Sequence, residues 1–135
     1  MADSGLRDQI AVIMDKAVRS LEASKSLLDG DNCDFSSSRS YYAAFYALQA
    51  LMLTKNLVYS KHAGVIGGFN EHFIRENIFP KEYSKYISRL FRERHIGDYD
   101  FKQVITHEDA EKDFSIASEL VGAIKQYLEG EGFSV

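Results

Sequence analysis

The segment Tyr41-Tyr42-Ala43-Ala44-Phe45-Tyr46-Ala47-Leu48-Gln49-Ala50-Leu51-Met52-Leu53 is the longest apolar run in the chain, interrupted only by Gln49. Wound as a helix, it is apolar around most of its circumference, which is typical of a helix with neighbours on several sides. Its length of 13 residues is well short of the roughly 20 needed to cross a bilayer. The segment therefore predicts a buried central helix, extending over about residues 36 to 55.

The segments before and after this run also repeat apolar residues at helical spacing, and none alternates for long enough to indicate a strand. The sequence therefore predicts an all-α protein, an antiparallel up-and-down bundle of four longer helices plus one short helix. The short helix contains several glycines, so we expect it to be broken. The predicted helices span residues 5 to 29, 36 to 55, 61 to 77, 80 to 95 and 106 to 129.

Local signals suggest where these helices begin and end. The serines at positions 36 to 38 are candidate N-caps of the second helix, and Pro80 suits the first turn of the fourth. Thr106 is a candidate N-cap of the last helix, whose acidic first turn complements the helix dipole. Residues 96 to 105 include Gly97 and lack a helical period, so they are predicted to form a loop.

Length and composition predict one globular domain over residues 1 to 135. The hydrophobic fraction is 45%, the charged fraction is 27% and the net charge is -4. An acidic average argues against broad coating of nucleic acid but allows a local basic patch. Cys33 is the only cysteine, and the amino-terminal residues do not resemble a signal peptide, so we expect a cytoplasmic protein.

The stretch Arg92-Glu93-Arg94-His95-Ile96-Gly97-Asp98-Tyr99-Asp100 concentrates guanidinium, imidazole, carboxylate and phenol groups. Such a mixture at a helix end indicates a phosphate or nucleic-acid site. Arg39, in the serine-rich start of the second helix, is a further candidate. The alternative is structural: the arginines would be a solvated helix end whose cations suit the dipole, with Asp98 pairing to one of them.

Metal and cofactor sites are not predicted. No Glu is followed three residues later by His, as a di-iron bundle requires, and the four histidines His62, His72, His95 and His107 lie in separate segments. The glycines of Gly64-Val65-Ile66-Gly67-Gly68 lack the Lys-Ser/Thr of a phosphate loop, so they are expected to relax a helix or permit close packing. Acidic neighbours should raise the pKa of Cys33, which argues against a nucleophilic thiol.

Three stretches resemble the HEPN family, the higher-eukaryote and prokaryote nucleotide-binding domain, over about residues 7 to 129. Ser38 to Leu51 is similar to the family's second helix, with its polar start and Tyr-Tyr-Ala-x-Phe core. The segment Arg94 to Asp100 resembles the Arg-polar-x-Ala-Asp-Tyr-Asp stretch of a small prokaryotic branch. Lys61-His62-Ala63-Gly64-Val65 resembles the x-His-x-Gly entry to the middle helix.

This resemblance implies a bundle of four to five helices, usually dimeric and often encoded beside a small nucleotidyltransferase. Many members are metal-independent ribonucleases, frequently toxins, with an Arg-x(4 to 6)-His motif assembled across the dimer. Here His95 directly follows Arg94, and Asp98 falls near the expected histidine position. Arg89 and His95 have the literal spacing but would lie about 240° apart around a helix, so we prefer the register that starts at Arg94.

The leading hypothesis is a homodimer without a cofactor that binds nucleotide or RNA phosphate, or a nucleotidyltransferase partner, in a toxin–antitoxin pair. The expected ligand-binding residues are Arg39, Arg92, Arg94, His95, Asp98 and Tyr99. One alternative is a metal-independent ribonuclease in which His95 and Arg94, or Arg89, are catalytic; binding is preferred over catalysis. Another is a protein-interaction module that uses surplus apolar surface of the second helix.

Overall fold

The computed structural model describes residues 4–135, so the first three residues of the predicted domain lie outside the described part. The predicted all-α bundle of four longer helices and one short helix is confirmed. A π-helical turn, η1, directly continues the short helix. The elements are α1 (Ser4–Asp29), α2 (Cys33–Thr54), α3 (His62–Phe69), η1 (Asn70–Ile74), α4 (Glu82–Tyr99) and α5 (His107–Gly130).

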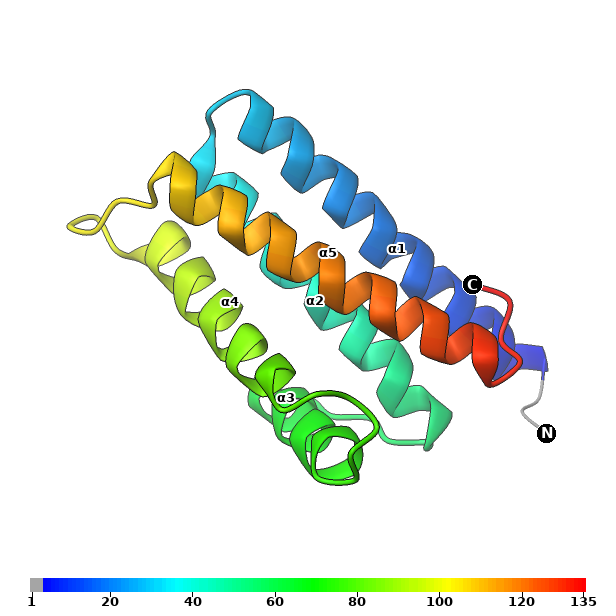
Figure 1. The fold of residues 1–135 in the computed structure, drawn as a ribbon. Coiled ribbons are helices and arrows are strands. Elements are labelled where there is room, and N and C mark those ends of the chain that lie inside the picture. The colour runs from blue at the N-terminus through cyan, green and yellow to red at the C-terminus, as the bar shows by residue number, and fades with distance from the viewer. Residues whose placement is uncertain (1–3) are drawn as a thin grey trace.

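The four longer helices run alternately up and down the bundle (Figure 1). The helix α2 contacts α1, α3, α4 and α5 and is therefore central, as its apolar circumference predicts. At one end of the bundle the α1–α2 turn lies near the end of α4 and the start of α5 (Figure 1). Polar residues that are far apart in the sequence gather at this end.

Burial of α2 supplies the centre of the core. Tyr41, Leu48 and Leu51 have no exposed surface, and burying one such large side chain is worth roughly 1.5–3 kcal/mol. The apolar circumference of α2 is thus mostly covered within the chain. A half-buried stripe of α2 remains, and its residues recur about one helical turn apart: Tyr42, Tyr46, Gln49 and Leu53.

The structure corrects the predicted start of α2. This helix begins at Cys33, after Asn32, whose side chain makes no capping hydrogen bond. The prediction that serines 36 to 38 cap the helix is wrong, because all three lie inside it and are buried. The small Ser24 and Ser36 side chains instead let α1 and α2 approach closely, and each hydroxyl donates to the other residue's carbonyl oxygen at 2.9 Å.

The predicted end of α4 at His95 is also wrong, because the helix continues to Tyr99 and includes Gly97. A Cβ atom at Gly97 would lie 3.1 Å from the carbonyl oxygen of Asp34. Gly97 therefore permits a close approach between α4 and the start of α2 rather than ending the helix. Pro80 is likewise not in the first turn of α4, since it precedes the N-cap residue Lys81.

Other local predictions hold. Thr106 caps α5, with its side chain accepting from the Asp109 amide at 3.1 Å in a capping box. The side chain of Tyr59 packs so closely over Gly64 and Gly68 that a Cβ atom at either would come within 3.0 Å of it. These two glycines therefore serve close packing, which was one of the two expected roles.

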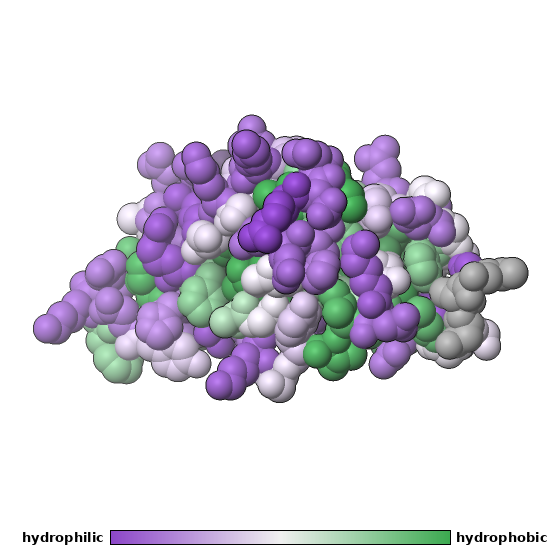
Figure 2. Space-filling view, turned by 90° about the horizontal axis from the view of Figure 1, so that it is seen from below, coloured by the Kyte–Doolittle hydropathy of each residue, from purple (hydrophilic) through white to green (hydrophobic). Residues whose placement is uncertain are grey.

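Hydrophilic side chains cover much of the face seen in Figure 2, and the apolar ones form separate patches between them. No helix within residues 4–135 combines the length and the apolar character needed to cross a bilayer.

Candidate functional site

Arg94 lies at the centre of the polar cluster that connects α4 to α2. Its Nη2 donates a 2.8 Å hydrogen bond to the Tyr42 hydroxyl, and its Nε lies 3.3 Å from Oδ2 of Asp98. The helical period places Asp98 one turn beyond Arg94, on the same face of α4. Only 14% of the Arg94 side chain is exposed.

Aromatic rings surround this guanidinium. Its central carbon lies 5.6, 5.4 and 5.5 Å from the ring centroids of Tyr41, Tyr42 and Tyr99, within the range of cation–π attraction. The Arg39 guanidinium lies 4.8 Å from the centroid of the same Tyr42 ring. Two cations therefore share Tyr42, and we call Arg39, Tyr42, Arg94, Asp98 and Tyr99 the arginine–tyrosine site.

The hydrogen-bonding capacity of Arg94 is only partly used. Burial alone would lower the pKa of Arg94, but the Tyr42 hydrogen bond and nearby groups, including Asp98, raise it above its ordinary value. The Nε atom is buried, and no described residue accepts a hydrogen bond from it, because Asp98 is close but not aligned with the N–H. A charged guanidinium has five N–H donors, so the site holds a fixed cation with donors to spare.

His62, at the start of α3, extends the site on the side of Tyr41. Its Nδ1 lies 2.8 Å from the Tyr41 hydroxyl, and its ring centroid lies 4.1 Å from that of Phe45. Burial, helped by the positive charge of Arg94, lowers the pKa of His62 and so favours the neutral imidazole. His62 was not among the predicted site residues, although the family-like Lys61-His62-Ala63-Gly64-Val65 stretch was the signal that pointed to it.

The predicted site residues do not all meet. Arg39, Arg94, Asp98 and Tyr99 come together, and the exposed His95 lies at the edge, with its ring centroid 5.1 Å from that of Tyr99. Arg92 is two residues from Arg94 and therefore points to another side of α4. It lines a separate hollow that also includes Arg89 and Lys112.

Arg89 belongs to a structural network rather than to this site. Its Nε donates to the completely buried Asp113 at 2.8 Å, and its Nη2 lies 3.3 Å from Glu93. Ser37 of α2 donates to the other carboxylate oxygen of Asp113 at 2.8 Å. The network joins α2, α4 and α5 and occupies the Arg89 guanidinium.

The fold has a close structural counterpart. The crystal structure of TT1696 from Thermus thermophilus superposes with a TM-score of 0.75 and covers 87% of this chain and 97% of its own. The identity is 15%, so the likeness concerns the fold alone.

The HEPN domain model matches residues 10–127, and the chain therefore belongs to the HEPN family. Its relatives include the "Putative toxin MJ0142" of Methanocaldococcus jannaschii, 36% identical over 89% of this chain and 82% of that protein. The "Putative toxin MJ0605" of the same organism is 33% identical over 96% of both chains. A UPF0332 protein of Thermotoga maritima is 33% identical over 84% of this chain and 86% of that one.

Proposed function

We propose that this HEPN protein binds the phosphate of a nucleotide or RNA at the arginine–tyrosine site. The observation that carries the proposal is the largely buried Arg94 guanidinium, which keeps its charge and donates one side-chain hydrogen bond, to Tyr42, among the described residues. Guanidinium groups bind phosphate oxygens through paired, charge-assisted hydrogen bonds. The exposed ring of Tyr99 offers a surface on which a base could stack.

The charges of the site support an anionic ligand. Arg39 and Arg94 contribute two positive charges and Asp98 one negative charge, so the site is cationic although the chain is acidic overall. Ser38 donates to Asp98 at 3.3 Å, and Asp98 in turn pairs with Arg94. In this proposal Asp98 orients the guanidinium, and the phosphate binds on the side that Asp98 leaves open.

Substitution of Arg94 tests this proposal. Arg94→Met removes the charge but keeps an unbranched apolar stem, and we expect at least a tenfold loss of affinity for a fluorescently labelled RNA oligonucleotide and for ATP. Arg92→Met is the matched control, because it removes the same charge from another side of α4. Unchanged affinity in a folded Arg94→Met protein, or an equal loss in both variants, would overturn the assignment.

The relatives named as toxins support a finer proposal, that this protein is one half of a toxin–antitoxin pair. The proposed partner is a small nucleotidyltransferase, and the proposed assembly is a homodimer in the cytoplasm. Co-expression of the chain with a nucleotidyltransferase encoded beside it should yield a stable complex on size exclusion. Separate elution of the two proteins would contradict the partnership.

The alternative function is a metal-independent ribonuclease with Arg94 and His95 as catalytic residues. The observation that favours it is the exposed His95 beside Tyr99, where it can face a substrate or a second subunit. Labelled RNA incubated in EDTA should then be cleaved by the native protein and not by His95→Ala. Absence of cleavage, or equal cleavage by both proteins, would exclude this activity.

A further inference from the structure

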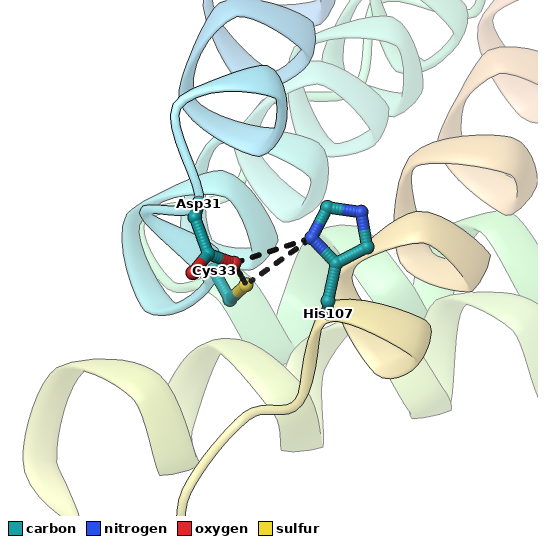
Figure 3. A group of neighbouring side chains, drawn as sticks. All are labelled: Asp31, Cys33 and His107. Carbon is teal, nitrogen blue, oxygen red and sulfur yellow. Dashed lines mark hydrogen bonds and ion pairs between the residues drawn. The ribbon is translucent and has the colours of Figure 1, made fainter.

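Three side chains with metal-binding atoms converge at the end of the bundle where α1, α2 and α5 meet (Figure 3). Asp31 lies in the α1–α2 turn, Cys33 is the first residue of α2, and His107 is the first residue of α5. Oδ1 of Asp31 lies 3.4 Å from the Cys33 sulfur and 3.3 Å from Nδ1 of His107. The sulfur lies 3.9 Å from the same Nδ1.

These separations fit three ligands of one zinc ion. With Zn–S near 2.3 Å and Zn–N or Zn–O near 2.0–2.1 Å, neighbouring ligand atoms in a tetrahedral site lie about 3.3–3.6 Å apart. Two sides of the observed triangle match this range, and the third exceeds it by a few tenths of an ångström. The same Asp31 oxygen and the same His107 nitrogen take part in these distances, so the three atoms form one closed triangle.

A carboxylate lies beside the ring nitrogen of His107 that does not face Asp31 and Cys33, as in the second coordination shell of many metal sites. Its other nitrogen, Nε2, lies 3.8 Å from Oε2 of Glu111, one turn further along α5. Histidines that bind metal through one nitrogen commonly present the other to a carboxylate, which fixes the ring and increases its basicity. Cys33 is buried while Asp31 and His107 are exposed, so the cluster lies at the surface of the bundle.

We propose that Asp31, Cys33 and His107 form a Zn²⁺ site, with water as the fourth ligand. A thiolate and an imidazole favour zinc over magnesium or calcium, which prefer oxygen ligands. The sequence does not predict this site, because His107 lies 74 residues beyond Cys33 and the ligands form no local motif. The ion would tie the α1–α2 turn to α5, so its binding should stabilise the fold.

The single cysteine makes the test specific. Metal is removed from tag-free protein with EDTA, the chelator is removed, and the protein is titrated with Co²⁺. Any absorption band from a thiolate bound to cobalt must then come from Cys33. We expect that band to saturate at one equivalent of Co²⁺ and to be displaced by Zn²⁺. It should be absent in Cys33→Ser and should need at least tenfold more Co²⁺ in His107→Ala.

His72→Ala is the matched control, because His72 lies in η1 and pairs with a different carboxylate, that of Glu71. It should bind Co²⁺ like the native protein, and Zn²⁺ should raise the melting temperature of both proteins but not of Cys33→Ser. His107 is exposed, so His107→Ala should leave the fold intact by circular dichroism. A missing thiolate band in the native protein, or undiminished Co²⁺ binding in His107→Ala, would overturn the site. Neither result bears on phosphate binding, which Arg94→Met tests separately.

Discussion

At the residue scale, the Tyr42 hydroxyl fixes the orientation of the Arg94 guanidinium. It accepts the only side-chain hydrogen bond found for the guanidinium within residues 4–135, while the Tyr42 ring also lies against Arg39. A hydrogen bond to a charged group is worth about 1.5–3 kcal/mol. The phenol therefore contributes both to stability and to the geometry of the proposed phosphate site.

Tyr42→Phe should lower the free energy of unfolding by about 1.5–3 kcal/mol, because it removes this bond and keeps the ring. It should also weaken phosphate binding, since the guanidinium loses a fixed orientation. Urea unfolding and ATP titration measure the two effects. Tyr46→Phe, one turn further along α2, is the control, because Phe keeps the ring that faces Lys16. Equal effects of the two substitutions would contradict the special role of Tyr42.

The pKa of His62 predicts a pH effect. Burial and Arg94 lower this pKa in the folded state, so between that value and about 6.5 the unfolded chain binds a proton that the folded protein does not. The free energy of unfolding therefore decreases, through His62, as pH falls through about 6.5. Burial raises the pKa of Glu93 and of Asp113 in the folded state. These carboxyl groups therefore increase the stability of the fold as pH falls.

Comparison with His62→Gln isolates the histidine, because Gln can still hydrogen-bond to Tyr41 but does not titrate. The melting temperature of the native protein should fall relative to that of the variant as pH decreases from about 7.5 to about 5. The opposing carboxyl groups are present in both proteins and cancel in the difference. Parallel pH profiles would show that His62 is not held neutral.

At the element scale, one buried ion-pair network joins three helices. The completely buried Asp113 of α5 accepts from Arg89 of α4 and from Ser37 of α2. Removing one partner of a buried ion pair leaves an uncompensated charge and costs about 3–5 kcal/mol, whereas replacing both with apolar residues costs much less. The network thus fixes how α4 and α5 pack against α2.

Arg89→Met should accordingly lower the free energy of unfolding by about 3–5 kcal/mol in urea denaturation. The double variant Arg89→Met/Asp113→Leu should cost less than the sum of its single substitutions. Arg92→Met, on the exposed surface of the same helix, should change stability by no more than about 0.5 kcal/mol. Additive effects of Arg89→Met and Asp113→Leu would argue against coupling between the two groups.

Helix boundaries show why local signals mislead. Glycine often ends a helix and serine often caps one. Nevertheless, Gly97 and the serines at 36 to 38 all lie inside helices. The same small side chains serve close packing, at Gly97 against Asp34 and at Ser36 against Ser24. A sequence does not distinguish these uses, because the neighbour that requires a small residue belongs to another part of the chain.

At the scale of the whole molecule, we expect two copies of the chain to associate. The half-buried stripe Tyr42, Tyr46, Gln49 and Leu53 adjoins the arginine–tyrosine site, so a second copy packed there would bring two sites together. We expect sedimentation velocity at micromolar concentration to give twice the chain mass. Tyr46→Glu should shift the protein towards monomer, because it places a charge within the half-buried stripe.

Phe101→Glu provides the control for this prediction. Phe101 is 99% exposed in the α4–α5 loop and is not part of the stripe, so its replacement should leave the mass unchanged. A monomeric native protein would contradict the proposed dimer. Dissociation by Phe101→Glu and not by Tyr46→Glu would move the interface to the loop.

The sequence by itself determined the all-α class, the central helix, the cap at Thr106 and the family, because helical periodicity, caps and motifs are local properties of the chain. It also placed Arg94 and Asp98 in one polar cluster, but it predicted a loop at Asp98, where the structure continues the helix. The tertiary structure alone decided that Tyr42 and His62 complete this site, that Arg89 is held by Asp113, and that Asp31 and Cys33 meet His107. Each of these contacts joins different helices or the turns between them, whose relative positions follow from packing around α2 rather than from any local pattern.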